Sequence, residues 1–218
     1  MASVEKYQQS AVYAMLRHNE RTSQTHHNMD IKQSDSHLNY KLSPDHGCSD
    51  YDYFKKHLEN YQCMKRSDIV KMASWVITAP EDLAPENESA FFECCHTFLN
   101  GRYGDNNEIQ CVVHYDEVHT FQDSKTGQLK TSRPHLHYCF IPATTDKNGD
   151  PRICAKKVLT PHDLRNFHLD LQKYLNANHI QASVYTGATQ KNGGSISVSE
   201  LKRDSKSLEK THERGFVF

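Results

Sequence analysis

Residues 109–142 read IQCVVHYDEVHTFQDSKTGQLKTSRPHLHYCFIP, and an apolar run occupies each end of this stretch. The runs at 109–114 and 135–142 are rich in β-branched and aromatic side chains, which favour strands. The residues between them are mostly polar, and DSKTG at 123–127 is a turn signal. We therefore expect the two runs to pair as an antiparallel hairpin with a long polar tip.

Two further runs upstream of this hairpin have the pattern of strands. Apolar and polar side chains alternate over 37–42, and ASWVIT at 73–78 combines β-branched and aromatic residues. The apolar run SAVYAML at 10–16 fits either a strand or a buried helical turn. The polar residues that follow it, up to Ser36, predict a long ordered loop.

Three segments have the spacing of helices. Apolar residues recur at a helical period over 50–69 and 85–99, with Pro85 in the first turn of the second segment and Gly101 just past its end. Thr160 is the expected N-cap of a third helix. Its apolar stripe consists of Leu164, Phe167, Leu171, Tyr174 and Leu175.

Strands and helices do not alternate one for one along the chain, which predicts an α+β fold. We expect an antiparallel β-sheet with helices packed on one face. The 218 residues suit one domain, which we place at 1–200. The charged segment 201–218, where Ser199 could cap a last helix, would then be the start of a truncated C-terminal region.

The composition excludes several classes of protein. Mean hydropathy is −0.80, and no apolar run approaches the roughly 18 residues of a membrane span. Residues 1–9 lack the basic-then-apolar pattern of a secretory leader. The cysteine count of seven is odd, and the sequence has no Cys-x-x-Cys pair. We therefore expect a soluble protein with free thiols in the reducing interior of a cell.

The formal net charge of −1 hides an uneven distribution. Counting Lys and Arg against Asp and Glu gives +1 for residues 1–66, −6 for 67–137 and +4 for 138–218. Phosphate binding needs only a local basic surface, which the two ends of the chain could supply. The near-neutral total is therefore compatible with nucleic acid.

The histidines of the hairpin predict a metal site. His135 and His137 are two residues apart on a strand, so their side chains leave the same face, about 6.6 Å apart along the backbone. His114 ends the partner strand and can converge on the same point. Three neutral nitrogens with open positions left over suit a catalytic ion that also binds substrate oxygens. Cys139 lies two residues further along, and we do not expect it to be a fourth ligand.

Two other groups could serve chemistry at this site. Asp116 and Glu117 follow His114, and either one could orient a ligand histidine or accept a proton, or both could be solvated hairpin charges. Near the N-terminus, His18 precedes Arg21 by three residues. If this segment folds over the metal, the imidazole could attack phosphorus while the guanidinium holds a phosphate oxygen.

These blocks of sequence resemble the plasmid mobilisation and recombination (Mob/Pre, MobV-type) relaxases. They are HNER at 18–21, THHNMDI at 25–31, SHLNYKL at 36–42, HYDE at 114–117 and PHLH at 134–137. The last block is similar to the HUH motif of this family, in which two histidines flank a bulky apolar residue. The likeness covers about residues 14–142, and 160–202 is compatible with it.

The resemblance implies an HUH endonuclease that nicks one strand at the transfer origin of a plasmid or mobile element. It implies that His114, His135 and His137 hold Mn²⁺ or Mg²⁺, and that Glu117 is an acidic relay with Asp116 beside it. His18 would be the nucleophile. The 5′ phosphate would stay on the protein, and the reverse reaction would rejoin the strand after transfer.

The resemblance also implies partners and a location. The substrate would be single-stranded or hairpin transfer-origin DNA in the bacterial cytoplasm, and a missing C-terminal region could form a homodimer. Two departures from the family stand out. Seventeen residues, 118–134, separate the Asp-Glu pair from PHLH, which indicates a lengthened hairpin tip. Lys41 stands where an acidic residue is common, and we assign it no role.

Histidine has a physical advantage over tyrosine as the nucleophile. A tyrosine with a pKa of about 10 is only roughly one part in a thousand ionised at pH 7, whereas a histidine with a pKa of about 6.5 is already about three-quarters neutral. Tyr13 and Tyr40 remain rivals for the role. Tyr40 could instead stack on a base, with Asn39 beside it as a second DNA contact, and Tyr13 could simply pack.

Three other functions compete with the relaxase. A DNA-binding protein could recognise the origin or a promoter without cutting it. A rolling-circle replication initiator shares the HUH chemistry but usually relies on tyrosine, which the HNER block at 18–21 disfavours. A metal phosphoesterase acting on small substrates would not need the long polar N-terminal segment.

Overall fold

The computed structural model describes residues 2–22, 28–122 and 127–185. The helix expected from Ser199 and the segment 201–218 lie outside these residues. At the centre is a five-stranded sheet in which every neighbouring pair is antiparallel. Its strands, in spatial order, are β1 (Ala2–Gln8), β3 (Val70–Thr78), β7 (His135–Phe140), β4 (Glu108–His114) and β2 (Tyr40–Lys41).

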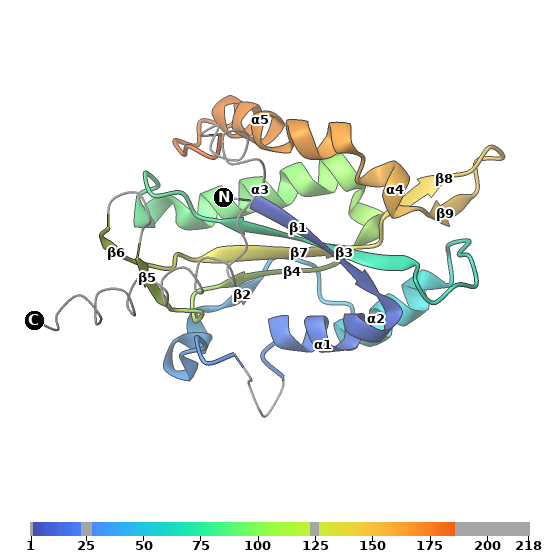
Figure 1. Cartoon of the computed structure of the whole chain (residues 1–218), viewed down its shortest axis with the longest axis horizontal. Coiled ribbons are helices and arrows are strands. Elements are labelled where there is room, and N and C mark those ends of the chain that lie inside the picture. The colour runs from blue at the N-terminus through green and yellow to red at the C-terminus, as the bar shows by residue number, and fades with distance from the viewer. Residues whose placement is uncertain (1, 23–27, 123–126, 186–218) are drawn as a thin grey trace, which may run out of the picture.

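Helices cover both faces of the sheet (Figure 1). α3 (Glu88–Tyr103) and α5 (Pro161–Ala177) bury Phe91, Phe98 and Phe167 against one face. α1 (Gln9–Asn19) and α2 (Asp50–Leu58) pack Leu16 and Phe54 against the other. The expected α+β fold is confirmed, but the expectation of helices on a single face is wrong.

The interior strand β4, which lies between β7 and β2, shows why both faces of the sheet need a helical layer. All seven of its residues are buried. Its sequence, EIQCVVH, lacks the regular apolar–polar alternation of a strand with one wet face. A strand buried on both sides requires a helical layer on each side, and the run at 109–114 already carried that signal.

The expected hairpin is formed by β4 and β7, with His114 directly opposite His135 and Val112 opposite His137. Its polar tip contains a smaller hairpin of β5 (Thr120–Gln122) and β6 (Leu129–Thr131). Ser132 closes the base of this smaller hairpin, because its amide donates to the His119 carbonyl over 2.8 Å.

The third predicted helix is α5, and it begins as expected. The Thr160 hydroxyl accepts a hydrogen bond from the Asp163 amide over 3.0 Å, as an N-cap should. Phe167 on the apolar stripe stacks on Trp75 with ring centroids 3.6 Å apart. This contact anchors α5 on the sheet.

The ends of two other helices differ from the expectation. α2 stops at Leu58, well short of residue 69. A 3₁₀ turn, η2 (Pro85–Asn87), precedes α3, which runs through Gly101 to Tyr103. Gly104 ends it with φ +88°, a backbone conformation that favours glycine.

Among the expected strands, one needs correction, one open alternative is decided, and one strand of the sheet was not expected. Residues 33–38 form a 3₁₀ turn, η1 (Gln33–Leu38), so only Tyr40–Lys41 of the predicted 37–42 strand joins the sheet. The run 10–16 lies in helix α1, which selects the helical alternative. Strand β1 was not expected, because it lies at the sheet edge, where exposed polar side chains interrupt the alternation.

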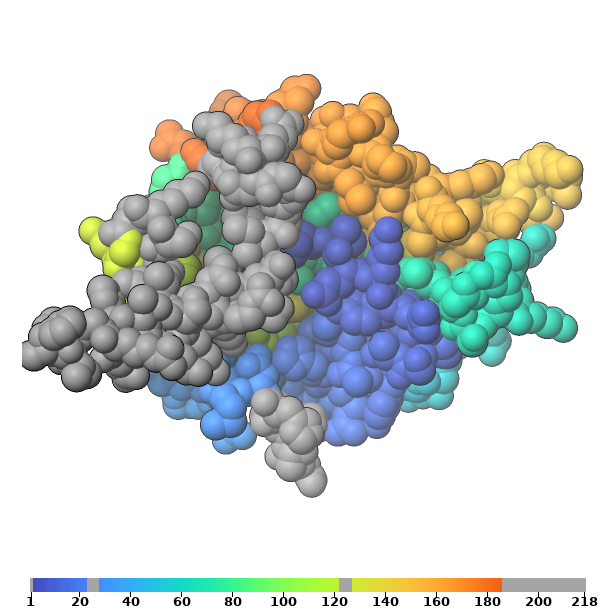
Figure 2. Space-filling model, in the orientation of Figure 1, coloured from blue at the N-terminus to red at the C-terminus, as the bar shows by residue number. Residues whose placement is uncertain are grey.

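The remaining elements lie toward one end of the molecule. They are η3 (Asp105–Asn107), β8 (Ala143–Thr145), β9 (Pro151–Ile153) and α4 (Ala155–Val158). The β8–β9 hairpin projects from the body on the right of Figure 2. None of the described helices is both long and apolar enough to cross a membrane, and all seven cysteines are free.

Candidate active site

Strand register brings the three predicted histidines together on the α1 face of the sheet. His114 and His135 are opposite each other, and His137 lies two residues along the same strand. The ring centroids are 5.5 Å apart for His114 and His135, and 4.9 Å apart for each of the other two pairs. Leu136 points to the opposite face, into the core beneath α3.

The ring nitrogens of this cluster fit a divalent cation. His114 donates through Nε2 to the Asn19 carbonyl over 2.9 Å, which leaves Nδ1 as the free lone pair. Within the described part of the chain, His114 Nδ1 and both nitrogens of His137 are buried without a hydrogen-bond partner. One ligand atom from each of His114, Glu117, His135 and His137 lies within 4.8 Å of all the others.

Burial keeps the imidazoles of His135 and His137 neutral and able to bind an ion. Burial, reinforced by the neighbouring histidines, lowers the pKa of His135 to about 4 and holds the pKa of His137 well below its usual value. A neutral ring has a lone pair to donate at pH 7. Imidazole nitrogens with one carboxylate oxygen suit Mn²⁺ better than Mg²⁺, which prefers oxygen ligands throughout.

Helix α1 delivers His18 to the edge of this cluster. His18 Nε2 lies 3.0 Å from Glu117 Oε1, and its ring centroid is 6.2 Å from that of His114. The two rings come from segments nearly one hundred residues apart in sequence. The structure thus brings the predicted nucleophile beside the predicted metal ligands.

Arg21 ends α1 in an unusual backbone conformation. Its φ is +56°, in the left-handed region. The Arg21 amide donates to the His18 carbonyl and the Thr22 amide to the Arg17 carbonyl, which is the hydrogen-bond pattern of a Schellman cap. Glycine usually occupies this position. Arginine here turns its guanidinium back toward Asp116 and Glu117.

The two carboxylates hold that guanidinium firmly. Arg21 Nε and Nη2 donate to the two oxygens of Asp116 over 2.8 and 2.6 Å, and Nη2 also donates to Glu117 Oε1 over 2.8 Å. The Ser36 hydroxyl donates to Asp116 over 2.6 Å. Arg21 is thereby joined to segments that follow it by 15 and 95 residues.

Both carboxylates are ionised. Burial on its own raises the pKa of Asp116, but hydrogen bonds from Arg21 and Ser36 outweigh burial and hold the pKa well below its usual range. Burial likewise opposes ionisation of Glu117, whose pKa is nevertheless far below its usual range because the imidazoles of His114, His18 and His135 surround the carboxylate. The reading of these two residues as ordinary solvated charges does not fit this burial.

The remaining candidates lie elsewhere. Asn39 Oδ1 accepts from the Tyr115 amide over 2.7 Å, so this side chain braces the end of the hairpin. Tyr40 is paired with Val113 and packs toward α3, on the face opposite the histidines. Tyr13 is 47% exposed on α1 and meets Tyr51 edge to face. Cys139 bonds weakly to Ser74 rather than joining the cluster.

Sequence reasoning missed a buried polar network behind His18. Asn19 Nδ2 donates to Gln110 Oε1 over 2.7 Å, and Gln110 Nε2 donates to Asp50 Oδ2 over 2.8 Å. Lys41, to which no role was assigned, completes the network with a 2.5 Å ion pair to Asp50. Gln110 interrupting the apolar run 109–113 was the one available signal.

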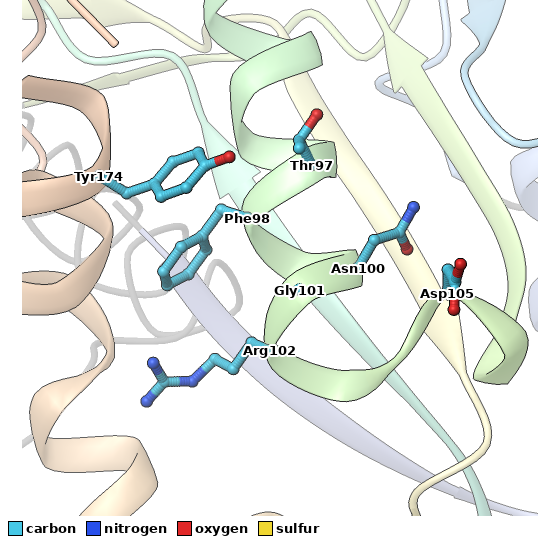
Figure 3. Close-up of a pocket in the computed structure, with 7 residues that line it drawn as sticks. All are labelled: Thr97, Phe98, Asn100, Gly101, Arg102, Asp105 and Tyr174. Atoms are coloured by element: carbon cyan, nitrogen blue, oxygen red, sulfur yellow. The ribbon is translucent and has the colours of Figure 1, made fainter. Parts of the chain in front are cut away.

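A shallow hollow along α3, to which Tyr174 of α5 also contributes, is separate from this site. Figure 3 shows Phe98, Arg102 and Tyr174 on the side of α3 that faces α5, and Asn100 and Asp105 on the other side. All of these residues lie on or beside the helical layer opposite the histidines. The hollow therefore has no part in the histidine chemistry.

The fold is that of a relaxase domain. The structure is similar to the MobM relaxase domain bound to Mn and to plasmid pMV158 oriT DNA, solved at pH 6.8, with a TM-score of 0.73, 27% identity and coverage of 94% of this chain and 97% of that one. A second structure of that domain with Mn and oriT DNA, solved at pH 4.6, has a TM-score of 0.71 and 26% sequence identity. It covers 93% of this chain and 98% of that one.

The sequence places the chain in a family. The profile of the family described as plasmid recombination enzyme (Mob/Pre) matches residues 1–194, so the chain belongs to this family. The predicted resemblance is confirmed.

Two curated relatives carry the same description. The protein of Streptococcus agalactiae is 27% identical over 233 residues, covering 100% of this chain and 43% of that protein. The protein of Lactiplantibacillus plantarum is 30% identical over 204 residues, covering 88% of this chain and 50% of that protein. The chain therefore spans about half the length of the curated relatives it matches.

Proposed function

We propose that this chain is a relaxase domain that nicks one strand of transfer-origin DNA of a plasmid or mobile element and later rejoins it. The observation that carries the proposal is the position of His18, 3.0 Å from a carboxylate that also faces His114 and His135. A nucleophile next to a set of metal ligands is what attack on a phosphodiester requires.

Each side chain has a distinct task in the proposed reaction. His18 Nε2 forms the bond to phosphorus, and the phosphorus–O3′ bond breaks with its electron pair going to O3′, which becomes a hydroxyl by taking a proton from solvent. Glu117 orients the imidazole and is placed to take the Nε2 proton of a protonated ring, which leaves the Nε2 lone pair free to attack while the other ring proton stays on Nδ1. Arg21 offers guanidinium charge beside the nucleophile for a phosphate oxygen.

The histidine cluster supplies the ligands for a divalent ion. His114, His135 and His137 would bind Mn²⁺, with Mg²⁺ the weaker alternative, and Glu117 is close enough to share in binding. When bound, the ion would polarise the scissile phosphate. Asp116 stays with Arg21 and does not reach the ion in this scheme.

We also propose the substrate and setting that the family relatives suggest. The MobM relaxase domain was solved with oriT DNA, and we assign single-stranded or hairpin origin DNA to this chain. The cytoplasm of a bacterium follows from that substrate. The relaxase domain would cover residues 1–200, and a homodimer through a C-terminal region stays a prediction.

The proposal is tested with a supercoiled plasmid that carries the transfer origin of the element encoding this chain. With Mn²⁺, relaxed plasmid should form, with protein attached to a 5′ end by an acid-labile phosphorus–nitrogen bond. His18→Ala should abolish the adduct and keep DNA binding. The matched control is His162→Ala, which changes an exposed histidine on α5 and should cut normally.

Three results would overturn parts of this proposal. DNA that is bound but left intact indicates a non-cleaving origin or promoter binder. An adduct that survives acid and His18→Ala removes His18 as the nucleophile. Cutting that is unchanged by a metal chelator removes the role of the histidine cluster.

A further inference from the structure

A second group of metal-ligating side chains lies on the other face of the sheet. His96 comes from α3, and Glu108 and Cys111 come from β4. One ligand atom from each lies within 4.8 Å of the other two. The group faces α3, so the sheet separates it from the histidines of the candidate active site.

The three side chains are held in place by neighbours. His96 Nε2 lies 2.8 Å from Glu108 Oε1, and Asn100 Nδ2 donates to Glu108 Oε2 over 3.2 Å. The Tyr138 hydroxyl donates in turn to Asn100 over 2.7 Å. The three potential ligands are therefore pre-positioned on a helix and an interior strand of the sheet, which lowers the free-energy cost of binding an ion.

Because this group is buried, the negative charge of its carboxylate must be balanced by a positive charge nearby. Glu108 is 5% exposed and Cys111 is fully buried, whereas the His96 side chain is 17% exposed. A buried carboxylate needs a positive partner. The ion pair described for Glu108 is with His96, which can supply that charge only when protonated. A divalent ion with one thiolate, one carboxylate and one neutral imidazole sums to zero charge, which a buried site tolerates.

We propose that His96, Glu108 and Cys111 form a second metal site, selective for Zn²⁺ and similar ions, that joins α3 to β4. Sulfur, nitrogen and oxygen are the ligands Zn²⁺ takes in proteins, and a thiolate disfavours Mn²⁺ and Mg²⁺. Solvent beside the partly exposed His96 would complete the tetrahedron. As the metal–sulfur bond forms, the thiol proton passes to solvent.

Burial holds the pKa of the Cys111 thiol well above its ordinary value, so the thiol is neutral in the metal-free chain. Without an ion, the group is a His–Glu pair next to a neutral thiol. This inference does not rest on the relaxase activity, because it concerns ligand atoms on the other face of the sheet.

Cobalt substitution tests the site in the whole 218-residue chain. Co²⁺ bound through Cys111 should show a thiolate-to-metal charge-transfer band in the near ultraviolet, which an all-nitrogen and oxygen site lacks. A His135→Ala background removes competition from the candidate active site. Cys111→Ser should abolish the band, and Cys94→Ser, at a half-buried cysteine on α3 two residues before His96, should retain it.

Two further variants guard against misfolding of Cys111→Ser. His96→Ala and Glu108→Gln should each weaken Co²⁺ binding by at least about tenfold, with unchanged circular dichroism. X-ray absorption of the Zn²⁺ form should show one sulfur among the ligands. A band that persists in Cys111→Ser, or a Zn²⁺ shell without sulfur, would overturn the proposal and leave the group as a buried ion pair.

Discussion

Arg21 and Asp116 form a two-point ion pair, with Nε–Oδ2 and Nη2–Oδ1 distances of 2.8 and 2.6 Å. The Arg21 side chain is 9% exposed and the Asp116 side chain is fully buried. The pair joins the end of α1 to the residues just past the end of β4. It therefore sets the distance between His18 and the histidine cluster, and the left-handed backbone of Arg21 is the conformation that permits it.

Glycine should be a more stable replacement for Arg21 than alanine, the reverse of the usual order within a helix. Loss of one partner of a buried ion pair costs about 3–5 kcal/mol. Glycine relieves a left-handed strain of about 1–2 kcal/mol that alanine keeps. Arg21→Ala should therefore be about 1 kcal/mol less stable than Arg21→Gly in urea unfolding, and equal stabilities would contradict the cap assignment.

The same variants should separate stability from cutting. If Arg21 holds the phosphate, Arg21→Gly should lower the rate of strand cleavage about 100-fold or more. Arg17→Ala, which changes a neighbouring arginine bound to Tyr13 and Thr22, should keep its rate. Single-turnover cleavage of an origin oligonucleotide measures both.

Metal binding should depend on His137, whose two ring nitrogens are buried without partners in the described structure. Mn²⁺ at about 100 times its dissociation constant should raise the free energy of unfolding by about 2.7 kcal/mol. The increase should vanish in His137→Ala. Thermal unfolding with and without Mn²⁺ measures it, and His37→Ala, at an exposed histidine on η1, serves as the control.

Stability should also fall in mild acid because of His168. Burial lowers the pKa of His168, and the Ala2 amide donates to its Nε2 over 3.3 Å, which requires the neutral ring. The unfolded chain then binds more protons than the folded one below a pH of about 6.5, so stability decreases as the pH falls. Urea unfolding at pH 7.5 and 5.5 should show a smaller difference in His168→Gln.

Substitutions at the N-cap of α5 and on its buried face should lower the free energy of unfolding by different amounts. Phe167 is fully buried against Trp75, so Phe167→Ala should lose about 3–5 kcal/mol. Thr160→Ala removes only the N-cap hydrogen bond and should lose about 1 kcal/mol. Chemical denaturation measures both, and similar losses would show that the stacking contact does not anchor the helix.

The hairpin and the histidine cluster were predictable because both follow from local rules. Alternation along a strand places His135 and His137 on one face, and pairing of the two runs brings His114 opposite. The Thr160 cap is equally local. Each of these features depends on residues that are close in sequence or on one pairing.

The parts that were not predicted depend on contacts between distant segments. No spacing rule joins Ser36 to Asp116, or Asn19 to Gln110, because α1, η1 and β4 meet only after folding. The second helical layer was missed although the run 109–114 lacks the alternation of a strand with one exposed face. The edge strand β1 has too few buried side chains to produce a pattern.

Hydrogen bonds of the Ser132 side chain close the base of the smaller hairpin of β5 and β6. The Ser132 hydroxyl donates to the Glu117 carbonyl over 2.7 Å and accepts from the His119 amide over 2.9 Å. These bonds fix the base of the β5–β6 hairpin independently of the pairing between His114 and His135. Substitutions within β5 or β6 should therefore leave the relative positions of His114 and His135 unchanged.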